Sequence, residues 1–225
     1  MNPISAVTVL NSFLYEGYAQ GIFRHVNTHL ATQGASRTFS VAPAIDVGMI
    51  DTKNLSYDEY IRLISEERYS AILLDYSLLS IEWETKGTEI VRHRYMYIPC
   101  PVRSDVISER PVEIEIADYF SQLDRKLLGD YLISQGYLRF DYTKDIVLKD
   151  IHHPFAHMTT ISSDCRVAMR SPLSVGDFFN FIFDNFYPSH ASFWLDYQPH
   201  LRTLCEDTIR DSEVNRMHFY WVDEY

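Results

Sequence analysis

Apolar residues near the N-terminus recur at steps of three and four, which is the spacing of one face of a helix. The series begins at Ile4, continues through Leu10 and Leu14, and reaches Leu30 before a break that contains Gly, Ala and Ser. The pattern predicts one long helix over residues 3–33. Its apolar stripe is expected to face either the core or a partner protein.

Further helices are predicted downstream, and two of them have recognisable start signals. Ser56 and Glu59 have the spacing of a capping box, which predicts a helix that runs to about Arg68. Ser174 is a suitable N-cap for the phenylalanine-rich helix that follows it. Helical periodicity predicts two more helices, over residues 116–134 and 201–215.

Runs rich in β-branched and aromatic residues lie between the predicted helices and are typical of strands. Residues 71–84 and 89–98 flank a short Thr-Lys-Gly-Thr turn and are predicted to form a long antiparallel hairpin. A second hairpin is predicted from residues 158–161, through a polar Ser-Ser-Asp turn, to a strand that begins at Cys165. Shorter strands are predicted at residues 38–41 and 137–142.

These elements predict an α+β fold, in which an antiparallel β-sheet built from hairpins packs against helices. The chain has 225 residues and is 46% hydrophobic, so we expect a single α+β domain over residues 1–225. The sequence has no apolar run long enough to cross a membrane and no signal peptide, so we expect a cytoplasmic protein without membrane contact. Three cysteines without a CxxC pair fit that reducing compartment.

Candidate chemistry is concentrated in the second predicted hairpin and its entrance, a stretch that holds three of the nine histidines. His153 and His157 lie at the entrance, and Arg166 and Arg170 lie on the return strand. Imidazole transfers protons near neutral pH and guanidinium binds phosphate oxygens, so these residues form a candidate polyanion site. In this interpretation the two histidines are catalytic, and Arg166, Arg170 and Arg94 bind phosphate.

Structural roles for the same residues remain open. Alternation along residues 89–98 places Arg92 and Arg94 on one face of that strand. Glu82 and Glu84 share a face of the preceding strand, so a ladder of ion pairs on a solvated side is an alternative role for the arginines. The histidines can likewise be neutral imidazoles that donate to backbone carbonyls at the entrance of a strand.

A zinc site would need donors from the same hairpin. His153, His157 and Cys165 are residue types that zinc prefers. A histidine pair of this spacing converges on one ion when it lies on a helix, but Pro154 disfavours helical geometry at the residue before it. We therefore do not expect zinc.

A separate acidic set offers another metal site. Asp75, Glu84 and Lys86 match the D…ExK spacing of metal-dependent nucleases, in which two acids hold Mg²⁺ and the lysine supports the attacking water. The lysine falls in the predicted turn of the first hairpin, which weakens the match. The set remains an alternative catalytic site that would require Mg²⁺.

Several segments, taken in order, are similar to successive blocks of one bacterial family. These segments are residues 75–83, 92–101, 138–142, 153–157, 165–167 and 171–173 with the helix that follows. Over about residues 5–190 the chain resembles the uncharacterised domain of unknown function 2290 family. The family's blocks fall on Arg94, Asp141, His153, His157 and Arg166 of this chain.

The resemblance implies a biological setting but no assigned activity. Some members are similar to proteins encoded beside a helicase in anti-phage defence loci, which implies a defence role linked to nucleic acid. Two classes of function follow: a module that docks on a helicase and binds or positions nucleic acid, or a nucleic-acid hydrolase that acts as an effector nuclease.

Charge restricts how such a protein meets nucleic acid. The net charge of −11 confines any nucleic-acid contact to one face of the protein. We therefore expect tight binding only in a complex with the helicase or another defence protein. The exposed parts of the N-terminal helix or the aromatic tail at residues 219–225 are the expected docking surface.

Overall fold

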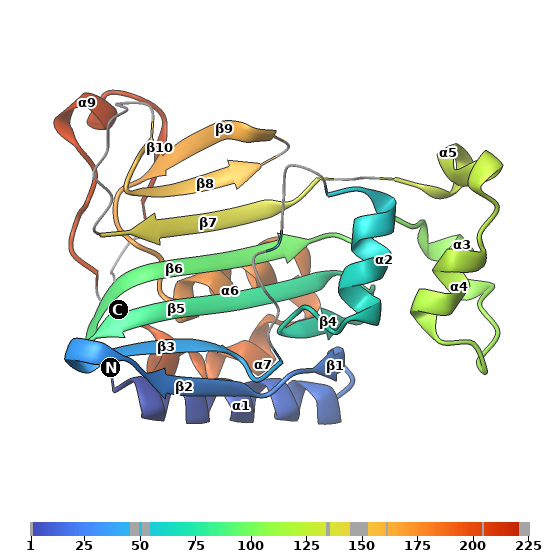
Figure 1. Cartoon of the computed structure of the whole chain (residues 1–225), viewed down its shortest axis with the longest axis horizontal. Helices are drawn as coiled ribbons and strands as arrows, with labels where there is room; N and C mark the ends of the chain where they lie inside the picture. Colours follow the sequence, from blue (N-terminus) through green and yellow to red (C-terminus); the bar gives the residue numbers. More distant parts are fainter. Residues whose placement is uncertain are drawn as a thin grey trace.

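The computed structural model describes residues 2–45, 50, 55–133, 136–144, 153–160, 162–203 and 205–220, with only the backbone at 162–164. Within these residues the chain forms a mostly antiparallel sheet of ten strands (Figure 1). The strands are β1 (Phe23–Val26), β2 (His29–Gln33), β3 (Thr38–Pro43), β4 (Ala71–Leu73), β5 (Leu78–Lys86), β6 (Glu89–Ile98), β7 (Leu138–Thr143), β8 (Ala156–Thr160), β9 (Ser162–Met169) and β10 (His218–Phe219).

The main path of the sheet follows the order β1-β4-β5-β6-β7-β8-β9-β10. The β2–β3 hairpin joins it at β5, whose first residues pair with β4 and whose last residues pair with β3. β10 pairs with β9 in the parallel direction, while the other pairs are antiparallel. The α+β class is confirmed, and so is the antiparallel pairing of β5 with β6 and of β8 with β9. The Ser-Ser-Asp turn predicted at 162–164 is wrong, because these residues belong to β9.

Helices occupy both sides of the sheet. They are α1 (Pro3–Ala19), α2 (Tyr57–Ser65), α3 (Ser104–Ser108), α4 (Ile116–Gln122), α5 (Leu128–Tyr131), α6 (Val175–Phe186), α7 (Ala191–Leu195), α8 (Gln198–Leu201) and α9 (Asp211–Val214). In the described part of the chain, none of them combines the length and apolar character needed to cross a bilayer.

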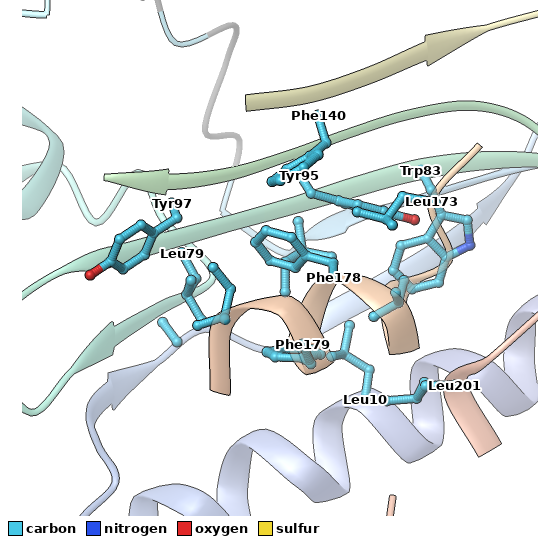
Figure 2. Packing of buried hydrophobic residues seen from close by; sticks show 14 of the residues in the cluster. Leu10, Leu79, Trp83, Tyr95, Tyr97, Phe140, Leu173, Phe178, Phe179 and Leu201 are labelled. Atoms are coloured by element: carbon cyan, nitrogen blue, oxygen red, sulfur yellow. The ribbon is translucent and has the colours of Figure 1, made fainter. Parts of the chain in front are cut away.

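One face of the sheet carries the larger hydrophobic core, which α1, α6 and α7 cover. Tyr95 and Phe140 project from the central strands onto Phe178 of α6 (Figure 2). Phe13 of α1 packs edge-on against Phe179, with ring centroids 4.6 Å apart. This face is called the core face below.

The opposite face is apolar only at one end. There Met96 and Ile98 of β6 pack with Tyr60 of α2 and Phe120 of α4 in a second hydrophobic cluster. Figure 1 shows α2 crossing this end of the sheet, on the side away from α6. The remaining part of the face carries polar side chains and is called the polar face.

The predicted N-terminal helix over 3–33 is wrong beyond Ala19. Gly21 has a φ of 74°, and the Ile22 N–H donates to Gly17 O at 2.8 Å, so the chain closes the helix with a left-handed cap. The residues that follow form β1 and β2 instead. The helix stripe faces the core, because Leu10 and Phe13 are fully buried.

Other predicted elements are divided in the structure. The helix predicted at 116–134 ends at Gln122, because Leu123 is extended and the Asp124 side chain accepts from the Lys126 N–H at 2.9 Å. The helix predicted at 201–215 is replaced by the short helices α8 and α9. The strand predicted at 71–84 is broken into β4 and β5 by a turn after Leu73.

Candidate functional site on the polar face of the sheet

The register of the strands defines the polar face. Glu82, Arg94, Asp141 and His157 are direct partners across β5, β6, β7 and β8. In the neighbouring row, the partners across β6, β7, β8 and β9 are Met96, Arg139, Thr159 and Arg166. Directly paired residues project to the same side of a sheet, so Arg94 and Arg166 share one face, about 14 Å apart across the strands.

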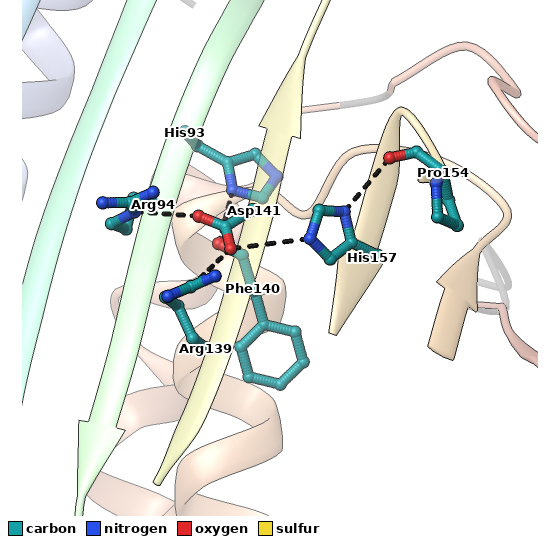
Figure 3. Close-up of polar contacts among 7 residues, drawn as sticks. All are labelled: His93, Arg94, Arg139, Phe140, Asp141, Pro154 and His157. Atoms are coloured by element: carbon teal, nitrogen blue, oxygen red, sulfur yellow. Dashed lines mark hydrogen bonds and ion pairs between the residues drawn. The ribbon is translucent and has the colours of Figure 1, made fainter. Parts of the chain in front are cut away.

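Asp141 is the centre of this face (Figure 3). Arg94 Nε donates to its Oδ1 at 2.8 Å, and Arg139 Nε donates to its Oδ2 at 2.5 Å. Burial alone would raise the pKa of Asp141, but the two guanidiniums hold this pKa below its ordinary value. One carboxylate therefore serves two arginines and stays ionised.

His157 lies beside Asp141 but is not bound to it. Its side chain is buried, its Nδ1 donates to Pro154 O at 3.1 Å, and its Nε2 lies 3.7 Å from Asp141 Oδ2. Burial lowers the pKa of His157 to about 4, against an opposing effect of Asp141. His153 packs edge-on against this ring, with centroids 4.9 Å apart. His157 is consequently a neutral imidazole at pH 7.

Arg166 is a positively charged residue of the polar face whose charge no described carboxylate neutralises. Within the described residues it has no carboxylate partner, and its buried Nε makes no hydrogen bond. Thr159, its partner across β8, is fully buried and its Oγ1 is also unsatisfied in the same part of the chain. As far as its side chains are described, the polar face therefore combines an arginine that has no carboxylate partner with one carboxylate that two other arginines share.

The edge of the face near β3 is more exposed. Arg92 pairs with Glu84 across β5 and β6 at 3.1 Å, with side-chain exposures of 47% and 33%. A pocket of about 130 Å³ lies here, lined by Glu82, Glu84, Arg92 and Arg94 together with Ser40 and Ala42. The predicted ladder of ion pairs is thus present for Arg92, whereas Arg94 turns to Asp141.

Of the two further candidates of the polyanion site, Arg170 lies apart from this cluster, and His153 contacts it through the ring of His157. Arg170 follows the end of β9, is exposed, and pairs with Asp207 at 2.7 Å. His153 is half-buried and its carbonyl accepts from Arg210 Nη2 at 3.3 Å. Of the residues predicted to bind phosphate, the structure places only Arg94 and Arg166 on the face with His157.

The acidic set does not converge. Asp75 lies in the β4–β5 turn, where it accepts from the Ser77 N–H at 3.0 Å and from the Tyr187 hydroxyl. Glu84 lies six residues further along β5 than Leu78, a separation of about 20 Å along the strand. In the described residues, no three His, Cys, Asp or Glu side chains are grouped as metal ligands.

The zinc set is also not assembled. Among the described residues, His153, His157 and Cys165 do not form a group of metal ligands, and Cys165 is exposed on β9. Sequence reasoning also missed Arg139, which completes the Asp141 cluster. The signal was available in the alternation of β7, which places Arg139 and Asp141 on the same side of that strand.

A known protein family matches the chain over most of its length. The profile of the family described as "Uncharacterized conserved protein (DUF2290)" matches residues 24–221, so the chain belongs to this family. No curated protein and no solved structure matches the chain. The matched residues include the whole polar face.

Proposed function

We propose that this member of the DUF2290 family is a non-catalytic module that binds the backbone of nucleic acid through its polar face and acts beside a helicase in anti-phage defence. The observation that carries the proposal is Arg166, a half-buried guanidinium without a carboxylate partner among the described residues. Arg94 and Arg139, which share one carboxylate, add to the positive charge around it. Guanidiniums that are not fully neutralised by carboxylates can donate hydrogen bonds to phosphate oxygens.

The state of the histidines favours binding over hydrolysis. A general acid or base must reach the substrate and must exchange protons near the working pH. His157 has an exposed fraction of only 3%, and burial lowers its pKa to about 4. Its Nδ1 is engaged by Pro154 O, so this imidazole positions the start of β8.

The charge of the whole chain supports a requirement for a partner. The net charge of −11 repels a phosphate backbone everywhere except at a local cationic region. Among the side chains that the structure describes on the polar face, there are four arginines and three carboxylates, which is a small positive surplus. We therefore propose that the isolated protein binds weakly and that a helicase supplies the remaining positive surface.

Exposed apolar side chains on α1 are the proposed docking surface for that partner. Ile4, Tyr15 and Tyr18 have exposed fractions of 58%, 48% and 52%. Tyr220, the last described residue, is 59% exposed near the C-terminal end. Serine substitutions at Ile4, Tyr15 and Tyr18 should reduce co-purification with the helicase, while the buried core side of α1 stays intact. Undiminished co-purification would remove α1 from the proposed interface.

Binding by the polar face is tested with a fluorescently labelled single strand of DNA or RNA at low salt. Arg166→Gln should weaken binding by roughly tenfold, because it removes one charge-assisted contact to phosphate. Arg125→Gln is the matched control, since Arg125 is exposed and pairs with Asp58 elsewhere on the surface. Equal affinities of the two variants would contradict the proposal that the polar face binds nucleic acid.

The non-catalytic part of the proposal has a separate test. The strand is incubated with the protein and its helicase partner, with and without Mg²⁺, and its length is followed. We expect no cleavage in any condition. Cleavage that is lost in His157→Gln but survives chelation of metal would instead assign acid–base catalysis to this histidine.

A further inference from the structure

A second polar pocket lies at the β1 edge of the sheet. It has a volume of about 530 Å³ and is formed by β1, the segment from the end of α2 to the turn after β4, and the loop that leads into α4. A pocket of this size can hold a small organic ligand. Its walls include two arginines, a histidine and two tyrosines: Arg24, Arg110, His25, Tyr69 and Tyr76.

Arg24 is fixed in position by two contacts. Its Nε donates to Leu74 O at 2.6 Å, and its Cζ lies 4.3 Å from the centroid of the Tyr76 ring. The guanidinium is exposed and, among the described residues, has no carboxylate within ion-pair distance. A guanidinium held against an aromatic ring loses little conformational freedom when it binds a ligand.

Arg110 contacts the hydroxyl group of the same tyrosine, Tyr76. Its Nη1 donates to Ile114 O, and its Nη2 lies 3.4 Å from the Tyr76 hydroxyl. In the described part of the chain, this arginine also has no carboxylate partner. One guanidinium thus lies over the face of the Tyr76 ring and the other beside its hydroxyl, without a carboxylate such as the one that Arg94 and Arg139 share.

A histidine adds a further donor to the pocket. Burial raises the pKa of Tyr69, so its hydroxyl stays protonated at neutral pH. That hydroxyl lies 2.9 Å from His25 Nδ1, which fixes the imidazole at the wall of the pocket. A ring nitrogen of histidine that carries a proton can donate to an anion.

The backbone of the pocket is strained. In the described residues four non-glycine residues have a positive φ, and two of them, Glu67 at 54° and Tyr76 at 68°, line this pocket. Such conformations destabilise a fold slightly and are found more often at binding sites. Tyr76, one of these two residues, is the ring that contacts both guanidiniums.

Two carboxylates at the rim restrict the kind of anion that fits. Glu67 and Glu115 line the pocket and are exposed. They oppose a ligand with many negative charges, such as a duplex backbone. Carboxylates can also accept hydrogen bonds from ribose hydroxyls, as acidic residues do in dinucleotide sites. The combination fits a single phosphate attached to a sugar or base.

We propose that this pocket binds the phosphate of one nucleotide, with Arg24 and Arg110 holding the phosphate oxygens and His25 donating from a ring nitrogen. The site is separate from the polar face, and it stands whether or not that face binds nucleic acid. Two sources present the same chemistry: a free mononucleotide, and the terminal phosphate of a nucleic-acid strand.

Calorimetric titration of the full chain with AMP and with adenosine tests the phosphate directly. AMP should bind at least tenfold more tightly than adenosine, because only AMP engages the guanidiniums. A single strand with a 5′-phosphate, compared with the same strand ending in a 5′-hydroxyl, tests the second source. Preference for the phosphorylated strand without binding of AMP would assign the site to strand ends. Failure to prefer the phosphate in both comparisons would overturn the proposal.

Substitutions locate the effect in the pocket. Arg24→Gln and Arg110→Gln should each weaken the preferred ligand by about ten- to a hundredfold, and Arg125→Gln should leave its affinity unchanged. Arg24→Lys keeps the charge but loses the planar fork, so it should weaken binding less than Arg24→Gln. Thermal unfolding of each variant checks that it is folded. Folded Arg24→Gln and Arg110→Gln variants with the affinity of the unmodified protein would also overturn the proposal.

Discussion

The two faces of the central strands bury histidines in different ways. On the core face, His93 Nδ1 donates to Phe140 O at 3.2 Å and its Nε2 accepts from the Leu173 N–H at 3.0 Å. On the polar face, His157 Nδ1 donates to a carbonyl, but its Nε2 has only Asp141 nearby, at 3.7 Å. Burial lowers the pKa of His93 to about 3 and that of His157 to about 4.

This difference separates a side chain that completes a core from one that lies in a charged cluster. Both ring nitrogens of His93 form hydrogen bonds with backbone groups. The hydrogen-bonding capacity of the neutral ring is therefore satisfied, and the ring serves to fill the core. His157 is kept neutral even though a carboxylate is close, because the effect of burial on its pKa outweighs the opposing effect of Asp141. The core face is therefore stabilised mainly by packing, and the polar face by the balance of its charges.

The largest expected effect is the loss of packing on the core face. Phe178→Ala should lower the free energy of unfolding by about 3–5 kcal/mol, because it removes a fully buried ring and leaves a cavity. Phe186→Ala on the same helix is the matched control, since this ring is 42% exposed. Urea denaturation measures both values. Similar losses for the two variants would contradict the assignment of the core face.

A smaller loss is expected from breaking the charge balance of the polar face. Asp141→Asn leaves two partly buried guanidiniums without their shared carboxylate, and should lower the free energy of unfolding by about 2–3 kcal/mol. Asp184→Asn, at an exposed position of α6, should change it by less than about 0.5 kcal/mol. An Asp141→Asn protein as stable as the unmodified one would show that the cluster is a set of independent surface charges.

The pH dependence of stability distinguishes a neutral His157 from an ion pair. With a folded pKa of about 4, below the unfolded value near 6.5, the unfolded chain binds the proton first as pH falls. Stability is then complete above about pH 6.5 and falls toward pH 4, by about 1.4 kcal/mol per pH unit for this histidine. His157→Gln should reduce the slope by that amount. A histidine paired with Asp141 as an imidazolium would instead lose stability as pH rises.

The smallest effect is expected at the exposed edge of the polar face. Arg92 and Glu84 form an ion pair that is largely open to solvent, with exposed fractions of 47% and 33%. Arg92→Ala should therefore change the free energy of unfolding by no more than about 0.5–1 kcal/mol. If Arg92→Ala lowered the free energy of unfolding as much as Asp141→Asn does, Arg92 and Glu84 would have to be counted as part of the buried charge cluster.

Strands β6 and β7 and the two helices with N-cap serines, α2 and α6, could be predicted from local pattern alone. The alternation of β6 and the Ser56 N-cap, whose side chain accepts from the Glu59 N–H at 3.2 Å, lie where the sequence places them. The end of α1 could not be predicted from periodicity, because Ile22 and Leu30 continue the apolar spacing into β1 and β2. Gly21 was the local signal that the helix ends there.

The candidate site was only partly predictable because it depends on register. The sequence indicates that Arg94 faces one side of β6, but not that Asp141 of β7 is its direct partner. The same limit applied to Asp75 and Glu84, whose spacing along the chain matches a metal site although they lie at opposite ends of β5. The pairing of strands distant in sequence is set by tertiary contacts, which local pattern does not contain.

The central claim is that Arg166 and its neighbours contact phosphate. The most direct measurement is the dependence of the dissociation constant on salt concentration, for a labelled single strand bound to the full chain with its helicase partner. On logarithmic axes, Arg166→Gln should reduce the slope by about 0.7, the value for one phosphate contact to a single strand, while Arg125→Gln keeps the slope of the unmodified protein. Identical slopes for all three proteins would contradict the claim.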